Sequence, residues 1–203
     1  RVNVQALDCD FLAFSGHKLL APTGVGVLYI SKQLHDAVEP YQVGGGMVFN
    51  VGWKRSSWAQ SPHKFEAGTP PIAQVVALGA ALDYLQKVDF DWLHQHEASL
   101  CTQLIEGLGK LDRVRILGPI EQLKKHGHLV SFVVDGIHAH DVAAYLDQHG
   151  VAVRAGHHCA QPLAVKLGYQ GSVRASFYLY NTAQDVQQLL GALQELLQQS
   201  FFS

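Results

Sequence analysis

Apolar residues recur at helical spacing in three long stretches of the chain. Residues 72–87, 89–111 and 186–197 each carry an apolar side chain at every third or fourth position. This repeat predicts an amphipathic helix over each stretch. Thr182 followed by Asp185 resembles a capping box and indicates the start of the last helix.

Short apolar runs of strand length alternate with the helical stretches. The predicted strands cover residues 11–14, 25–30, 114–117, 129–134, 151–154 and 173–179. We expect the first two to be buried neighbours in one sheet. Shorter helices are predicted over residues 32–39 and 140–148, and a loop is predicted over residues 124–126. The segment 50–71 has no sustained hydrophobic period, so we expect it to be irregular. Alternating short strands and helices predict an α/β fold.

The rhythm of the pattern changes near the middle of the chain. Two long helices meet at Val88 and Asp89, and beyond this break the strands and helices become short and regular. We therefore predict a domain boundary here, which separates residues 1–87 from residues 88–203.

Composition and charge narrow the class of protein. The chain has 203 residues, of which 48% are hydrophobic, and a formal net charge of -2. This charge does not indicate the basic surface that binding to nucleic acid or to an anionic membrane requires. No apolar run approaches the roughly 18 residues of a membrane span, and the first residues lack the apolar core of a signal peptide. We expect a cytoplasmic protein with no membrane or nucleic-acid partner.

The three cysteines favour free thiols. Cys9, Cys101 and Cys159 lie far apart without a CxxC spacing. This spacing is not typical of a disulfide framework or a structural zinc site.

A lysine follows the first predicted strand directly. Ser15, Gly16, His17 and Lys18 connect this strand to a glycine-rich turn. A strand end is where α/β folds place their chemistry. Lys18 is either a solvated lysine or an amine able to form a Schiff base with a carbonyl cofactor such as pyridoxal phosphate.

A second chemical stretch runs from Arg154 to Pro162. It places Cys159 just before a predicted helix, where helix-start amides and cationic neighbours favour a nucleophilic thiolate. Two alternatives remain open here. Cys159 is a small buried hydrophobe in one, and a metal ligand together with His157 and His158 in the other. No matching second ligand pair supports the metal site, so we expect none.

Five ordered motifs carry a specific resemblance. They are DCDFLAFSGHK at 8–18, PTGVGVLY at 22–29, FEAGTP at 65–70, RAGHHCAQP at 154–162 and RASFYLYNT at 174–182. Together they resemble group II cysteine desulfurases of the Suf and Csd type, also described as selenocysteine lyases. These are fold-type I pyridoxal phosphate enzymes of the class V aminotransferase superfamily. The resemblance implies that residues 1–87 are the C-terminal part of the cofactor-binding large domain and residues 88–203 the small α/β domain.

The resemblance assigns roles to single residues. It implies that Lys18 binds pyridoxal phosphate as a Schiff base and acts as the base at the substrate α-carbon. Ser15 and His17 would hold the cofactor phosphate, joined by Thr69 from the second subunit of a homodimer. For the substrate, it implies that Arg174 binds the α-carboxylate and that Cys159 takes the sulfur and becomes a persulfide. Arg154 either orients the cysteine loop at the substrate site or is a surface charge at the end of a strand.

The same resemblance implies substrate and partners. The substrate would be L-cysteine or L-selenocysteine, the product L-alanine, and the sulfur would serve iron-sulfur cluster assembly or another delivery route. The cysteine loop is short, as in group II enzymes, so we expect a SufE-like acceptor to dock over it. Gln161 is similar to the Csd branch and His157 to the Suf branch, which leaves the pathway open.

The resemblance corresponds only to the C-terminal half of such an enzyme. The aspartate that pairs with the pyridine nitrogen and the histidine that stacks on the ring precede the lysine strand in this family. We therefore expect the chain on its own to be inactive. Two alternatives remain, namely another class V aminotransferase or lyase, which needs no thiol at Cys159, and a non-catalytic domain.

Overall fold

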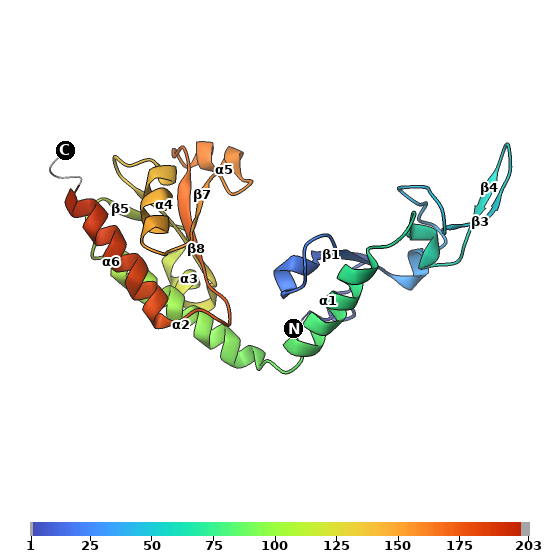
Figure 1. The fold of residues 1–203 in the computed structure, drawn as a ribbon, viewed down its shortest axis with the longest axis horizontal. Helices are drawn as coiled ribbons and strands as arrows, with labels where there is room; N and C mark the ends of the chain where they lie inside the picture. Colours follow the sequence, from blue (N-terminus) through green and yellow to red (C-terminus); the bar gives the residue numbers. More distant parts are fainter. Residues whose placement is uncertain (1, 200–203) are drawn as a thin grey trace. The chain divides into compact units, whose positions relative to one another are not determined.

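The computed structural model describes residues 2–199, and the chain divides after Val88 into two compact units (Figure 1). Each unit has its own strands, helices and buried side chains.

The first unit is built from two antiparallel strand pairs and one long helix. Its elements are, in chain order, β1 (Phe11–Ser15), the 3-10 turn η1 (Gly16–Leu19), β2 (Gly26–Ile30), η2 (Lys32–Leu34), β3 (Val48–Val51), β4 (Ser56–Trp58), η3 (His63–Phe65) and α1 (Ile72–Leu85). β1 pairs with β2 from Phe11 opposite Ile30 to Ser15 opposite Gly26. The pairing places the end of β1 and the start of η1 beside the glycine-rich turn that leads into β2.

The first unit buries little apolar surface. Ala21, Val25 and Leu78 form a core cluster where the β1–β2 connection meets α1. The predicted pairing of the first two strands is confirmed. The prediction that both are buried is wrong for the described residues, because Phe11 is 50% and Leu28 is 58% exposed. Side chains of a strand project from the faces of the sheet, and packing against those faces leaves these two positions uncovered.

Two further predictions in the first unit need correction. The helix predicted over residues 32–39 is only the single turn η2. The Lys64 ammonium donates to the carbonyl oxygen of His35 at 2.7 Å, which takes the acceptor that a continuing helix would use. The segment 50–71 is not wholly irregular, because it contains β4 and η3.

The second unit is a four-stranded antiparallel sheet with packed helices. Its elements are α2 (Phe90–Leu108), β5 (Val114–Leu117), α3 (Ile120–His126), β6 (Leu129–Val134), α4 (Ala139–Gln148), β7 (Arg154–Gly156), α5 (Gln161–Lys166), β8 (Ser172–Ser176) and α6 (Ala183–Gln199). The strand order is β5-β6-β8-β7, so β7 lies at an edge.

A continuous core holds the second unit together. Burial alternates along β6, where Val130, Phe132 and Val134 face the interior. Helices α2 and α4 contact the sheet, and α6 contacts both helices. Their apolar faces join the β6 side chains in one cluster, so the sheet has a buried face. Val173 and Ala175 of β8 belong to this cluster, and Ala155 of β7 packs against it.

The predicted helices of this unit are confirmed over most of their length. Asp89 caps α2 by accepting from the backbone N–H groups of Asp91 and Trp92. At α6, the Thr182 N–H donates to the Asp185 carboxylate at 2.8 Å, which is the acidic half of the predicted capping box. Among the described residues, no helix combines the length and the apolar character that crossing a bilayer requires.

Three boundaries in the second unit differ from the predictions. Residues 124–126 belong to α3 and not to a loop, because Ile120 and Leu123 pack against the core. β7 begins at Arg154 and not at 151, because the Val151 N–H is used to close the end of α4 on Leu146. β8 ends at Ser176 and not at 179.

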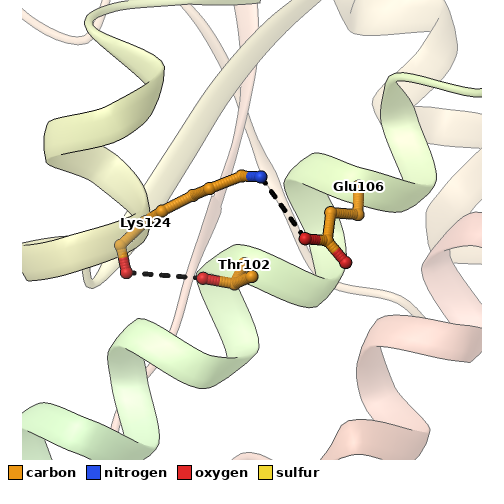
Figure 2. Close-up of polar contacts among 3 residues, drawn as sticks. All are labelled: Thr102, Glu106 and Lys124. Atoms are coloured by element: carbon orange, nitrogen blue, oxygen red, sulfur yellow. Dashed lines mark hydrogen bonds and ion pairs between the residues drawn. The ribbon is translucent and has the colours of Figure 1, made fainter.

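Helix α3 is held against α2 by polar contacts as well (Figure 2). The Thr102 hydroxyl donates to the Lys124 carbonyl oxygen at 3.3 Å, and the Lys124 ammonium lies 3.3 Å from a Glu106 carboxylate oxygen. The lysine thus contacts α2 through both its backbone and its side chain.

Candidate active site

The first group of candidate residues lies on the sharp turn between β1 and η1. Gly16 is buried, and its N–H donates to the Val25 carbonyl oxygen at 2.9 Å. A Cβ at Gly16 would lie 2.8 Å from Val25 Cγ1, so a side chain there would push the two strands apart. This close approach fixes where Ser15, His17 and Lys18 project.

These three side chains are available to a ligand. His17 and Lys18 are exposed, and Ser15 is half-buried. Within residues 2–199, none of the three side chains has a hydrogen-bond or ion-pair partner, and Ser15 does not cap η1 with its hydroxyl. The turn therefore presents one amine, one imidazole and one hydroxyl, a donor set that suits an aldehyde-bearing phosphate ester.

Thr69 lies in another part of the first unit. It is exposed and follows Gly68, whose N–H donates to the Gly45 carbonyl oxygen at 2.8 Å. The described residues show no hydrogen bond between Thr69 and the Ser15–Lys18 turn.

The second group of candidates lies in the second unit, on the turn between β7 and α5. His158 and Cys159 both adopt left-handed backbone conformations, with φ of 52° and 62°. The Ala160 N–H donates to the His157 carbonyl oxygen at 2.9 Å and closes the turn. Helix α5 then begins at Gln161 with Pro162 in its first turn. The result is an exposed Cys159 thiol at the tip of a tight turn.

Arg154 and Arg174 flank this thiol turn. They are directly paired on β7 and β8, and Arg154 Nη2 donates to Cys159 Sγ at 3.6 Å. A guanidinium in this position stabilises negative charge on sulfur. Arg174 Nε is buried and has no hydrogen-bond partner among the described residues. A buried guanidinium donor without a partner is suited to binding a carboxylate.

His158 is directed into the protein rather than toward solvent. Its Nε2 lies 3.1 Å from the Ser172 carbonyl oxygen and 3.0 Å from the Ser172 hydroxyl. Burial lowers the pKa of His158, and the positive charges of Arg174 and Arg154 lower it further, against a smaller opposing effect of the Ser172 hydrogen bond. The lowered pKa favours the neutral ring of His158 over the imidazolium.

The other two cysteines are in different environments. Cys9 is half-buried, with its sulfur 3.8 Å from the Val4 carbonyl oxygen. Cys101 lies fully buried in α2, where burial and the nearby Glu97 raise its pKa to about 12. Among the described residues Cys159 is thus the one exposed thiol, and no cluster of three or more His, Cys, Asp or Glu side chains is arranged to hold a metal ion.

Sequence reasoning missed Ser172 and the inward position of His158. The signal for Ser172 was a hydroxyl residue next to the apolar Val173 at the start of the predicted strand, and in the structure it is 1% exposed. The contact itself joins residues 14 positions apart and depends on the β7–β8 pairing.

The chain is similar to proteins named as cysteine desulfurases in both sequence and structure. A proposed cysteine desulfurase of Halobacterium salinarum is 48% identical over 97% of this chain and 47% of its own length, and one of Staphylococcus epidermidis is 46% identical over 100% and 48%. The chain spans about half the length of the curated relatives that it matches.

Solved structures give the same result. The apo cysteine desulfurase of Thermococcus onnurineus matches with a TM-score of 0.91 at 45% identity, over 97% of this chain and 49% of that one. The Escherichia coli cysteine desulfurase CsdA, with an S-sulfonic acid, matches with a TM-score of 0.89 at 41% identity, over 96% and 48%. The α/β, fold-type I assignment and the resemblance to cysteine desulfurases are confirmed. The family model for aminotransferase class-V matches residues 1–189, and the chain belongs to that family.

Proposed function

We propose that the protein to which this chain belongs is a pyridoxal-phosphate-dependent cysteine desulfurase in which Cys159 accepts the sulfur. The observation that carries the proposal is the Cys159 thiol turn, with an exposed sulfur that accepts a hydrogen bond from Arg154. The relatives and solved structures named as cysteine desulfurases, which match almost the whole chain, support the same reaction.

Cys159 performs the transfer step. Its thiolate attacks the sulfur of L-cysteine, so that a new S–S bond forms on the protein while the bond between the substrate sulfur and Cβ breaks. The carbon skeleton leaves as L-alanine after it takes up a proton. Arg154 supports this step because its guanidinium faces the sulfur that carries the charge.

The Ser15–Lys18 turn would hold the cofactor. Pyridoxal phosphate supplies the electron sink that stabilises negative charge at the substrate α-carbon. Lys18 would bind the cofactor covalently and carry the α-proton, while Ser15 and His17 would hold the phosphate. Their side chains fit this task because they are free of protein partners in the described chain. Thr69 would join the phosphate site from the second subunit of a homodimer, in keeping with its exposure and its lack of a bond to the turn.

Arg174 would bind the substrate α-carboxylate. Its planar guanidinium offers two parallel donors, which a lysine could not provide. The partnerless Nε supports this role, since a bound carboxylate would satisfy it.

The domain assignment and the partners are part of the same proposal. Residues 1–87 would form part of the cofactor-binding domain and residues 88–203 the small domain. A thiol turn that is closed by the Ala160 N–H bond to the His157 carbonyl oxygen cannot swing far, so a SufE-like acceptor would collect the sulfur by docking over Cys159. Free thiols suit a reducing cytoplasm, with delivery to iron-sulfur cluster assembly. L-selenocysteine is a second substrate of the same chemistry.

A C–S lyase is the second candidate. A cystine C–S lyase structure matches with a TM-score of 0.76 at 25% identity, over 96% of this chain and 48% of that one. A lyase of this kind has no need of the Cys159 thiol.

One assay separates the two candidates. The full-length protein that contains this chain is supplied with pyridoxal phosphate and L-cysteine, and alanine is quantified. We expect Cys159→Ala to lower the rate by roughly three orders of magnitude, as loss of a nucleophile does, while Cys9→Ala retains the wild-type rate. Retention of activity by Cys159→Ala would support the lyase instead.

A second assay tests the cofactor site. Borohydride reduction of the loaded protein fixes the cofactor to the lysine that holds it, and peptide mapping identifies that lysine. We expect Lys18 alone to be modified, with the exposed Lys32 of η2 as the internal control.

A further inference from the structure

We propose that Ser172 and His158 are positioning residues that hold the Cys159 turn in the geometry from which its sulfur reacts. The proposal rests on the function proposed above for Cys159, and it adds two residues that do not themselves touch the reacting atoms. The geometry that carries it is a buried hydroxyl on β8 bonded to the ring of the residue that precedes the thiol.

The turn needs an external anchor because its backbone is unfavourable. His158 and Cys159 are consecutive residues with positive φ, and neither is glycine. Left-handed conformations at residues with a Cβ persist only where surrounding contacts enforce them. One such contact is the Ala160 N–H bond to the His157 carbonyl oxygen, which closes the turn locally. The other is the His158 ring on Ser172, which ties the turn to the sheet.

The anchor itself is firmly placed. Ser172 is 1% exposed and opens β8, where it lies opposite Gly156 of β7. Its neighbour Val173 is fully buried in the core of the second unit. The anchor therefore moves only if the sheet moves, while the thiol it positions stays exposed.

The hydrogen bonds define the state of the ring. A carbonyl oxygen only accepts, so His158 Nε2 carries the proton that points at Ser172, and Nδ1 is left with a lone pair. Nδ1 is buried and has no partner among the described residues. The charged and titratable groups that act on the ring are Arg174 on β8, Arg154 on β7 and His157 in the turn, and all three oppose a positive charge on it.

The bond between His158 and Ser172 supports the contact between Arg154 and Cys159. The guanidinium of Arg154 reaches Sγ only if the turn folds back over five residues toward β7. Release of His158 from Ser172 would free the turn, and the sulfur would leave the guanidinium. Ser172 and His158 thus act on the thiol through Arg154 and the backbone.

The test uses alkylation of Cys159 by iodoacetamide at pH 7, followed by mass spectrometry of the Cys159 peptide. It requires neither cofactor nor substrate and is done on the full-length protein. We expect His158→Leu to slow the reaction by roughly five-fold, the effect of losing one hydrogen bond of ordinary strength. Ser172→Ala removes the hydroxyl but keeps the carbonyl acceptor, so it should slow the reaction by a smaller factor. His158→Gln, whose amide nitrogen can replace Nε2 as a neutral donor, should restore most of the rate. Ser176→Ala, an exposed serine of the same strand, should keep the wild-type rate.

Two results would overturn the proposal. One is a wild-type alkylation rate in His158→Leu, which removes the donor to both Ser172 oxygens. The other is equal slowing in His158→Gln and His158→Leu, since a general packing defect would not be rescued by a donor. In the desulfurase assay we expect Ser172→Ala to lower kcat and leave KM unchanged. If the protein proves not to be a desulfurase, the alkylation rates still decide whether Ser172 and His158 position the thiol.

Discussion

Arg154 Nη2 and Cys159 Sγ lie 3.6 Å apart, although the two residues are five positions apart along the chain. The left-handed turn at His158 and Cys159 brings the sulfur back toward the edge strand β7, where Arg154 is paired with Arg174. A single short segment therefore presents an exposed thiol and the guanidinium that contacts it, beside Arg174 of the paired strand β8.

The Arg154 contact predicts an effect on thiol reactivity. Replacing Arg154 with alanine removes the donor to sulfur, so we expect alkylation of Cys159 at pH 7 to slow by roughly five-fold. Arg115→Ala is the matched control, because Arg115 is an exposed arginine of β5 in the same sheet. Equal rates for Arg154→Ala and the unaltered chain would show that the contact does not influence the sulfur.

The three cysteines should react in a defined order. At pH 8 in the folded protein, iodoacetamide should modify Cys159 rapidly and leave Cys101 unmodified, because Cys101 is fully buried and has a pKa of about 12. In urea, Cys101 should react at the rate of an ordinary thiol. Labelling of Cys101 before unfolding would contradict the buried position of this side of α2.

Glu97 predicts a pH dependence of stability. Burial raises its pKa, and the nearby His128, His94 and His96 only partly oppose this effect. Because the folded-state pKa lies above the unfolded one, the stability that this group contributes is present below the unfolded pKa and is lost as the pH rises through the folded pKa. We expect Glu97→Gln to raise the free energy of unfolding at pH 7 and to have a smaller effect at pH 4.

Urea titrations at both pH values measure this difference. Glu106→Gln is the control, since Glu106 is a largely exposed partner of Lys124 (Figure 2) and its loss should cost at most about 1 kcal/mol. A lower stability of Glu97→Gln at pH 7 would mean that the carboxylate has a favourable role in the fold.

Two helix glycines form a matched pair for packing. A Cβ at Gly107 of α2 would collide with the Leu190 side chain of α6, whereas nothing lies within 4 Å of a Cβ at Gly191. Both alanine substitutions gain the same helix propensity, so Gly191→Ala should stabilise the protein by about 0.5–1 kcal/mol. Gly107→Ala should be less stable than Gly191→Ala by roughly 1–3 kcal/mol, the range for overpacking. Thermal unfolding followed by circular dichroism measures both, and equal stability would place α2 and α6 further apart.

The long periodic elements were predictable from the sequence, and the short ones less so. Helices α1, α2 and α6 were found because their apolar positions repeat over several turns. Helix α3 was missed because its seven residues offer too few repeats, and its polar end has the composition of a loop. The start of the edge strand β7 was predicted at residue 151 instead of Arg154, because the Val151 N–H is bonded to the end of α4 and not to a neighbouring strand.

The candidate site shows the same division. Lys18 and Cys159 stand out in the sequence because each follows a predicted strand, with Gly16 two positions before Lys18 and Gly156 three positions before Cys159. The contact of Arg154 with sulfur, and the anchoring of His158 on Ser172, require the backbone reversal and the β7–β8 register, which no local pattern specifies. The exposure of β1 and β2 could not be predicted from the sequence either, because an apolar run does not show which elements pack against it.

The most direct test of the account is the location of the sulfur during turnover. The full-length protein, loaded with pyridoxal phosphate, is mixed with L-cysteine, quenched with an alkylating reagent and mapped by mass spectrometry for persulfide. The account predicts persulfide on Cys159 and none on Cys9 or Cys101, with the signal abolished in Cys159→Ala. Persulfide on another cysteine, or alanine formed at the wild-type rate without persulfide on Cys159, would contradict it.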